Sequence, residues 1–352
     1  MRTFFVITLI ILAGIFSAIF IGFDVSDSTG NHTYDDEQEM LDEQIVIRFS
    51  HVVAETSPKG ATVRKFAELV YEKTEGKVKV DVFPNGVLYN DNNEWEAIQS
   101  GSVEMIAPAS SKLAPYYPRF QVLDLPFIFP NDQAVREAYE GKIGQQLMGD
   151  MKHDNAKPLT FWYNGFKQIT YRKHPILNPE DFERTHFRTM PSEVIKEQFQ
   201  MMGASTSVIP FNKIYRNLEV QFVDGQENTI SNIYTKKFYK HQPYVTFSQH
   251  GYLGYVVLIN RDFWEALPED LQMKIREALA EATDWNRRHA IEINDRHTRA
   301  LKRTGQTEVH FLTPEQREEW EKQLEPIYAK FKPIIGEGLM EEALNIRETY
   351  SR

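Results

Sequence analysis

Polar residues stand directly after several predicted strands, where a sheet can present them to a ligand. They lie in the segments 50–51, 109–112, 164–168, 186–190, 223–228 and 249–252. Ligands of open α/β sheets bind beyond the carboxyl ends of the strands, so these segments are expected to meet at one site. A few cations within such a site can attract an anion even when the whole chain is acidic. The sequence therefore predicts a binding site for a small polar ligand.

Signatures of catalysis are absent from the sequence. It has no cysteine and no G-x-S-x-G, H-E-x-x-H, phosphate-loop or dinucleotide motif. His289 and His297 stand too far apart on one predicted helix to share a metal, and the segment 90–94 resembles a calcium loop only in composition. We expect no enzymatic activity, no organic cofactor and no metal site.

Composition places the chain among ordinary globular proteins. Its 352 residues are enough for two domains, and 41% of them are hydrophobic and 26% charged. The formal net charge of −10 argues against a nucleic-acid partner, which needs a basic surface.

Strands and helices alternate through the chain from residue 45 onward. Strands are predicted at 45–49, 78–82 and 105–107, with helices at 57–73 and 92–99 between them, an order typical of a mostly parallel sheet covered by helices. The same alternation of strands and helices is predicted again further along the chain. It has strands at 159–163, 207–209 and 222–225, a short strand at 186–190, and helices at 192–202 and 212–217. A strand at 255–260 and a long helix at 270–303 follow, and 314–350 is predicted to form two helices. A second α/β domain and a helix long enough to lie across both domains are expected.

The N-terminus is predicted to be a targeting segment followed by a linker. Residues 4–23 carry no charge and are long enough to span a bilayer as a helix, so residues 1–23 are either an uncleaved anchor or a cleaved signal. Residues 24–44 contain eight acidic residues and no Lys or Arg, which is typical of a linker. Both alternatives export the globular part, to the periplasm or the outer face of the cytoplasmic membrane.

Five segments between residue 45 and the C-terminus resemble the solute-binding proteins of TRAP transporters, in the branch that binds C4-dicarboxylates. They are FSHVVAETSPKG at 49–60, YNGFKQ at 163–168, VDGQEN at 223–228, NIYTKKFY at 232–239 and HGYLGY at 250–255. The resemblance implies a two-domain clamshell like that of the type II periplasmic binding proteins, with mixed sheets flanked by helices and a long bridging helix. Residues 45–164 and 254–293 would form domain I, and 165–253 and 294–352 domain II.

The resemblance also implies a carboxylate site on domain II. Arg188 matches the family's ligand-binding arginine, and a guanidinium suits both oxygens of a carboxylate. Lys167 stands where many relatives have a second arginine. Asn228 is expected to donate from its amide, and Phe211 to wall the cleft. The alternatives are a salt bridge for Arg188, a solvated lysine for Lys167, a helix cap for Asn228 and plain core for Phe211.

Domain I is expected to hold the other end of the ligand. Ser110 and Lys112 lie on a strand-end loop, and Lys59 lies at a helix N-terminus, which attracts anions. His51 and His250 complete the candidate set, although each could be a satisfied buried histidine.

The resulting hypothesis is capture of succinate, malate or fumarate in the cleft and delivery to a TRAP permease. The resemblance implies a permease with a small and a large membrane subunit, driven by a sodium gradient. We expect a monomer that binds one ligand. The same scaffold could instead bind a sialic acid, keto acid or aromatic acid, or serve as the ligand reader of a sensor kinase.

Overall fold

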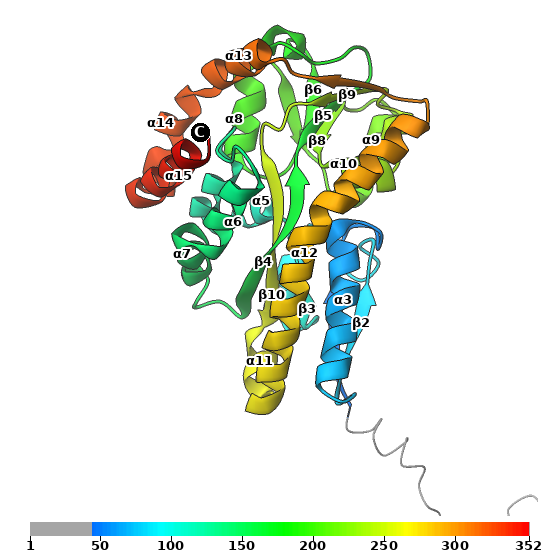
Figure 1. Cartoon of the computed structure of the whole chain (residues 1–352), viewed down its shortest axis with the longest axis vertical. Coiled ribbons are helices and arrows are strands. Elements are labelled where there is room, and N and C mark those ends of the chain that lie inside the picture. Colours follow the sequence, from blue (N-terminus) through cyan, green and yellow to red (C-terminus); the bar gives the residue numbers. More distant parts are fainter. Residues whose placement is uncertain (1–43, 352) are drawn as a thin grey trace, which may run out of the picture. The chain divides into compact units, whose positions relative to one another are not determined.

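The computed structural model describes residues 44–351, whose strands form two mixed sheets (Figure 1). The first sheet has the order β2-β1-β3-β10-β4, with bounds β1 (Ile45–Ser50), β2 (Val78–Phe83), β3 (Met105–Ile106), β4 (Ala156–Phe166) and β10 (Tyr252–Asn260). Strand β1 is parallel to β2 and β3, whereas β10 is antiparallel to both β3 and β4. The three strands on which the parallel sheet was predicted are thus parallel to one another, and β10 adds the antiparallel pairs that make the sheet mixed.

The second sheet has six strands within the described residues, in the order β11-β9-β5-β8-β6-β7. Their bounds are β5 (Gln168–Tyr171), β6 (His186–Thr189), β7 (Ser205–Val208), β8 (Gly225–Asn228), β9 (Tyr244–Phe247) and β11 (Glu308–Phe311). Strand β6 is parallel to β7 and β8, and β5 is antiparallel to β8 and β9. The carboxyl ends of β6 and β8 thus lie at the same edge of the sheet, which brings Arg188 and Asn228 together.

Helix α3 (Pro58–Lys73) shows how local sequence places a site residue. The Ser57 hydroxyl accepts a hydrogen bond from the Gly60 N–H at 3.2 Å, and Pro58 occupies the first helical turn, where it costs no hydrogen bond. Gly60 is required there, because a Cβ would lie 2.6 Å from the Cα of Glu55. Lys59 is thereby held at the N-terminal end of the helix.

The long helix α12 (Glu269–Arg303) contacts elements of both sheets, as predicted. It packs on α3 and β4 and then on α10 (Ile230–Thr235) (Figure 1). The chain also crosses between the sheets from β4 to β5 and from β9 to β10. The Lys167 N–H donates to the Gly251 carbonyl at 2.8 Å, which ties these two crossings together.

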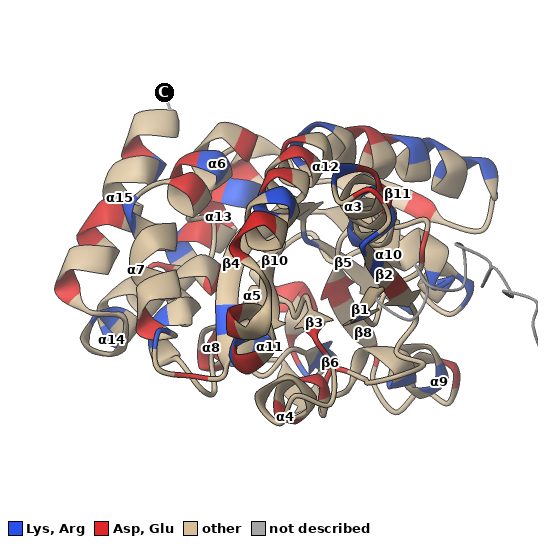
Figure 2. Cartoon of the chain, turned by 90° about the horizontal axis from the view of Figure 1, so that it is seen from below, with Lys and Arg blue, Asp and Glu red and all other residues tan. Residues whose placement is uncertain are grey.

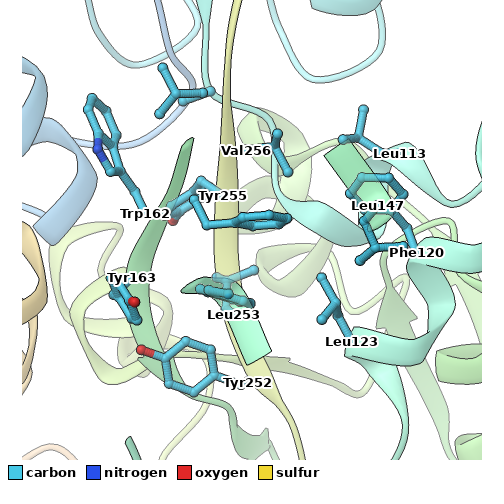
Figure 3. Close-up of a cluster of buried hydrophobic side chains, with 14 of the residues drawn as sticks. Leu113, Phe120, Leu123, Leu147, Trp162, Tyr163, Tyr252, Leu253, Tyr255 and Val256 are labelled. Carbon is cyan, nitrogen blue, oxygen red and sulfur yellow. The ribbon is translucent and has the colours of Figure 1, made fainter. Parts of the chain in front are cut away.

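The largest buried cluster of the described residues fills the space between the first sheet and its covering helices and extends to Ile169 of β5 and Phe187 of β6. Figure 3 shows Tyr252 and Val256 of β10 with Leu113, Phe120 and Leu147 from three of these covering elements. The covering elements are α5 (Ser110–Leu113), the 3-10 helix η1 (Pro118–Asp124), α6 (Asp132–Glu140) and α7 (Lys142–Asp150). Charged residues of both signs are spread over the outer helices (Figure 2).

The C-terminal region forms three helices where two were predicted: α13 (Pro314–Leu324), α14 (Pro326–Ile335) and α15 (Glu337–Tyr350). Pro326 separates the first two, because proline lacks the N–H that would continue the ladder and fits best at a helix start. Helices α14 and α15 pack on η1, α6 and α7, and α14 also packs on α8 (Glu193–Met201). They therefore contact elements that the sequence assigned to domain I, and the domain boundaries stay a prediction.

Within residues 44–351, no helix is long and apolar enough to cross a bilayer. The predicted targeting segment, and the predicted linker apart from Gln44, lie outside the described residues.

Candidate functional site

A pocket, called the cavity below, lies where the two sheets meet. Its lining comes from both, with Val52, Val53, Lys59, Asp91, Glu94, Ala109, Lys112, Leu253 and Tyr255 on the side of the first sheet and Arg188, Met190, Phe211, Asn228 and Asn232 on the side of the second. Five of the nine predicted site residues are thus brought together: Arg188, Asn228, Phe211, Lys112 and Lys59. That any of them contacts a ligand stays a prediction.

Arg188 is the dominant cation on the side of the second sheet. It lies near the end of β6 with 2% of its surface exposed, and its Nε donates to the Ile209 carbonyl at 2.9 Å. Burial lowers the pKa of Arg188 from its ordinary value, and Asp91 and Glu227 oppose that shift. Its two terminal nitrogens have no hydrogen-bond partner among residues 44–351. A buried guanidinium held at one nitrogen keeps its other donors for an anion.

Two amides and a ring complete that side. Asn228, the last residue of β8, accepts at Oδ1 from the Asn232 amide at 2.8 Å and from the Thr229 N–H at 3.1 Å. Asn228 thus contacts the first turn of α10 and lines the cavity, and its own amide donates to Gln226 Oε1 at 3.2 Å. Its contact with a ligand stays a prediction. Asn232 was missed as a candidate, although it belongs to one of the five resembling segments and follows Asn228 by one helical turn. Phe211, in the 3-10 helix η3 (Phe211–Lys213), forms part of the wall.

Lys59 and Tyr255 form a buried pair on the side of the first sheet. The Lys59 ammonium donates to the Ala107 carbonyl at 2.7 Å and lies 3.9 Å from the centre of the Tyr255 ring. Burial lowers the pKa of Lys59 to about 8, and the carboxylates of Glu94 and Asp91 oppose that shift. The ring and one carbonyl hold this ammonium without a direct ion pair, so it keeps donors for an anion.

Asp91 joins the two sides of the cavity. Its carboxylate pairs with the Lys112 ammonium at 2.7 Å and accepts from the backbone N–H of Phe211 at 3.1 Å. Sequence reasoning missed Asp91, because the segment 90–94 was considered only as a calcium loop. No group of side chains in residues 44–351 has the composition of a metal site.

Glu94 is the second carboxylate of the lining and was also missed. It is the first residue of α4 (Glu94–Gln99) and is 2% exposed. Burial raises the pKa of Glu94 to about 7, with Asp91 adding to the shift and Lys59 and Lys112 opposing it. Its Oε2 atom is fully buried and has no hydrogen-bond partner among the described residues.

Lys167 and His250 do not line the cavity, contrary to the expectation that they contact the ligand there. The Lys167 ammonium pairs with Glu227 Oε1 at 2.9 Å, and His250 Nε2 lies 2.8 Å from Glu227 Oε2. His250 Nδ1 is in turn 2.7 Å from the hydroxyl of Ser248. Burial alone would raise the pKa of Glu227, but Lys167 and His250 bring it to about 2. Lys167 and His250 thus belong to a buried ion-pair network with Glu227 that lies outside the cavity lining.

Ser110 and His51 also lie outside the lining. Ser110 is the buried first residue of α5, and its neighbour Lys112 reaches the cavity instead. His51 is fully buried, and burial together with Lys59 and Lys236 lowers its pKa to about 3, so its ring is neutral. Val52 and Val53, the next residues along the chain, line the cavity in its place.

The lining therefore combines three cations with two carboxylates and two amides, within apolar walls. Cations reach the cavity from both sides, which suits a small acid with a charged group at each end.

Comparisons with known proteins agree with this chemistry. Residues 49–333 match the model of the DctP family, described as "Bacterial extracellular solute-binding protein, family 7". The C4-dicarboxylate-binding protein DctB of Bacillus subtilis is 45% identical over 341 residues, which cover 96% of this chain and 97% of that protein.

Two solved structures share the fold. The TRAP periplasmic solute-binding protein of Sulfurospirillum deleyianum, with bound succinate, has a TM-score of 0.83 and 38% identity over 86% of this chain and 99% of that one. The sugar acid binding protein DctPAm of Advenella mimigardefordensis, in complex with galactonate, has a TM-score of 0.84 and 32% identity over 87% of this chain and 99% of that one.

Proposed function

The chain belongs to the DctP family, family 7 of the bacterial extracellular solute-binding proteins, and we propose that it captures C4-dicarboxylates for a TRAP transporter. Succinate, malate and fumarate are the proposed ligands. The observation that carries this proposal is the buried Arg188, with uncommitted donors, facing a cavity that also receives Lys59 and Lys112 from the opposite side.

A dicarboxylate can bridge the two sides of this cavity. Arg188 would bind one carboxylate in a forked geometry, with the amides of Asn228 and Asn232 beside it. Lys59 and Lys112 would bind the other carboxylate. A hydrogen bond to a charged group contributes ~1.5–3 kcal/mol net, and moving a clamshell from mostly open to mostly closed requires about 5.5 kcal/mol. Two to four such contacts therefore suffice to make closure depend on the ligand.

Closure would reshape the surface that a membrane permease meets. The proposed partners are the small and large membrane subunits of a TRAP permease, and the proposed location is outside the cytoplasmic membrane, reached through the N-terminal segment. No catalytic step is proposed, because the family is named for solute binding.

A hydroxylated organic acid is the second candidate ligand. Asp91 and Glu94 line the cavity, and carboxylates accept hydrogen bonds from hydroxyl groups that succinate lacks. The relative that binds galactonate supports this alternative. The lining gives no specific support to a sialic, keto or aromatic acid as the ligand. It gives none to a role as the ligand reader of a sensor kinase.

Calorimetry of the purified chain with succinate, malate, fumarate and galactonate tests the proposal. We expect tight binding of at least one C4-dicarboxylate and weaker binding of galactonate. Arg188→Ala and Arg188→Lys should each abolish high-affinity binding and leave the far-UV circular dichroism unchanged. Arg299→Ala, an exposed arginine on α12, is the matched control and should bind normally. Failure of the wild type to bind any of the three dicarboxylates would refute the proposed ligands, and tight binding by Arg188→Ala would refute the proposed site.

A further inference from the structure

Glu94 is a buried carboxyl group of the cavity that the proposed dicarboxylate contacts do not use. Its Oε2 atom is shut off from solvent and has no hydrogen-bond partner among the described residues. Leaving an ionised carboxylate in that state is costly, because a buried charge needs a partner that replaces its hydration. The neutral acid has a smaller desolvation cost and can also donate a hydrogen bond.

The other charged groups of the cavity face Glu94 from every element around it. Lys59 comes from α3, Lys112 from α5, Asp91 from the loop before α4 and Arg188 from β6. The lining thus contributes three positive charges against two negative charges when Glu94 is ionised. When Glu94 is neutral, the lining carries two net positive charges, which match the two negative charges of a dicarboxylate.

The tyrosine beside Lys59 does not alter the net charge of the lining. Tyr255 of β10 also lines the cavity, and burial raises its pKa further above neutrality, so its hydroxyl stays uncharged. The pKa of about 7 for Glu94 means that the protein without ligand holds this group near half protonation at neutral pH.

We propose that Glu94 takes up a proton when the cavity binds a dicarboxylate dianion, and that the neutral acid then donates its O–H to the ligand. This inference rests on the proposed function. Two negative charges entering the cavity repel the ionised form of Glu94 and leave the neutral form unaffected, so binding and protonation favour each other. By reciprocity, protonation of Glu94 strengthens ligand binding to the same extent. Glu94 thereby becomes a specificity-determining residue that favours dianions at neutral and lower pH.

One other group in the cavity could take up a proton, in a higher pH range. Lys59 has a pKa of about 8, and an anion beside it would favour its charged form. His51 stays neutral across this range because its pKa is about 3. His250 faces Glu227 rather than the cavity. Replacement of Glu94 and Lys59 separately therefore distinguishes the two sources of proton uptake.

Isothermal titration calorimetry of the full chain in detergent micelles tests the inference. The binding enthalpy of succinate is measured in buffers of different ionisation enthalpy, and the slope against that enthalpy counts the protons taken up. We expect the wild type to take up part of a proton at about pH 7 and close to one proton above the pKa of Glu94. Its affinity should fall by up to about tenfold for each pH unit across that range.

Variants assign the proton to Glu94. Glu94→Gln imitates the neutral acid, so it should take up no proton near pH 7, and its affinity should stay level until Lys59 titrates. Lys59→Met should lose the uptake that Lys59 contributes and bind more weakly, and its remaining uptake should move to higher pH, because Lys59 lowers the pKa of Glu94. Glu96→Gln, an exposed glutamate on the same helix, is the control and should behave as the wild type.

The outcomes separate the inference from the proposed function. If the wild type binds no dicarboxylate, the proposed function is refuted and the inference falls with it. If the wild type binds succinate without proton uptake, or Glu94→Gln keeps the full uptake near pH 7, the proposed function stands and the inference is refuted. If Glu94→Gln fails to fold, Lys59→Met decides the matter: uptake that persists in this variant supports the assignment to Glu94, and loss of all uptake refutes it.

Discussion

The buried network of Lys167, Glu227 and His250 should make the fold depend on a single carboxylate. Glu227→Gln removes the negative charge and leaves the Lys167 ammonium buried without its ionic partner. The two side chains are 1% and 0% exposed, so water cannot replace the lost interaction. The change is nearly isosteric, which restricts its effect to charge and hydrogen bonding.

The loss can be estimated in two ways. Breaking a buried ion pair from one side destabilises a protein by about 3–5 kcal/mol. The pKa of Glu227 lies at about 2 against an ordinary value of 4.5, and that difference corresponds to roughly 3 kcal/mol favouring the ionised form in the fold. Both estimates place the cost of Glu227→Gln near one third of the stability of a typical domain.

Urea unfolding followed by tryptophan fluorescence measures this cost. Glu227→Gln should lower the free energy of unfolding by about 3–5 kcal/mol, whereas the exposed Glu319→Gln should change it by less than about 0.5 kcal/mol. The double replacement Lys167→Met with Glu227→Leu removes both charges and should recover a large part of the loss. Because the pKa of Glu227 is depressed in the fold, its contribution is complete above about pH 4.5 and is lost as the pH falls toward 2.

His250 adds to the same acid sensitivity. Its pKa is lowered in the fold, so stability is lost as the pH falls below the ordinary value of 6.5 and the unfolded chain binds the proton more readily. If Glu227→Gln unfolds at the same urea concentration as the wild type, or if wild-type stability is level between pH 5 and pH 3, the role assigned to this network is wrong.

Two further predictions concern local geometry. Gly60→Ala places a Cβ 2.6 Å from the Cα of Glu55 and should clearly lower the melting temperature in a calorimetric scan. It should also lower dicarboxylate affinity, because Lys59 is the adjacent residue. A variant that melts like the wild type would contradict this prediction. Asp91→Asn breaks a nearly buried pair with Lys112, whose side chains are 4% and 9% exposed, and weakens the tie to the Phe211 N–H. It should lower the free energy of unfolding by about 3–5 kcal/mol and reduce affinity about tenfold or more. Urea unfolding and titration calorimetry measure the two effects, and unchanged affinity would argue against a coupling role for Asp91.

The elements that the sequence predicted well carry strong local signals. Strand β2 alternates valines with polar residues, and α3 begins with a serine cap followed by proline. The long helix α12 was recognisable because no proline or glycine interrupts it. Arg188 was found through the resemblance of its segment to a known family, and its position at the end of β6 follows from the sheet order.

The residues that sequence reasoning missed depend on tertiary packing. Glu94 and Asp91 lie in a polar segment that looks like any solvated loop, and the packing of α4 against β3 and β10 places them at the cavity. Lys167 was misassigned for a related reason. Its partner Glu227 is distant in the chain, and the antiparallel register of β5 and β8, with Ile169 opposite Glu227, brings the two side chains together.

The two sides of the cavity are prepared for a ligand in different ways, and this difference links binding to closure. Arg188 is fixed by one backbone hydrogen bond and has free donors, so it can bind a carboxylate without giving up a partner. Lys112 already pairs with Asp91, and a ligand carboxylate must compete with that pair. Asp91 holds the Phe211 N–H on the opposite side at the same time. A ligand that draws Lys112 away from Asp91 leaves that carboxylate to the Phe211 N–H alone, which strengthens this hydrogen bond across the cavity.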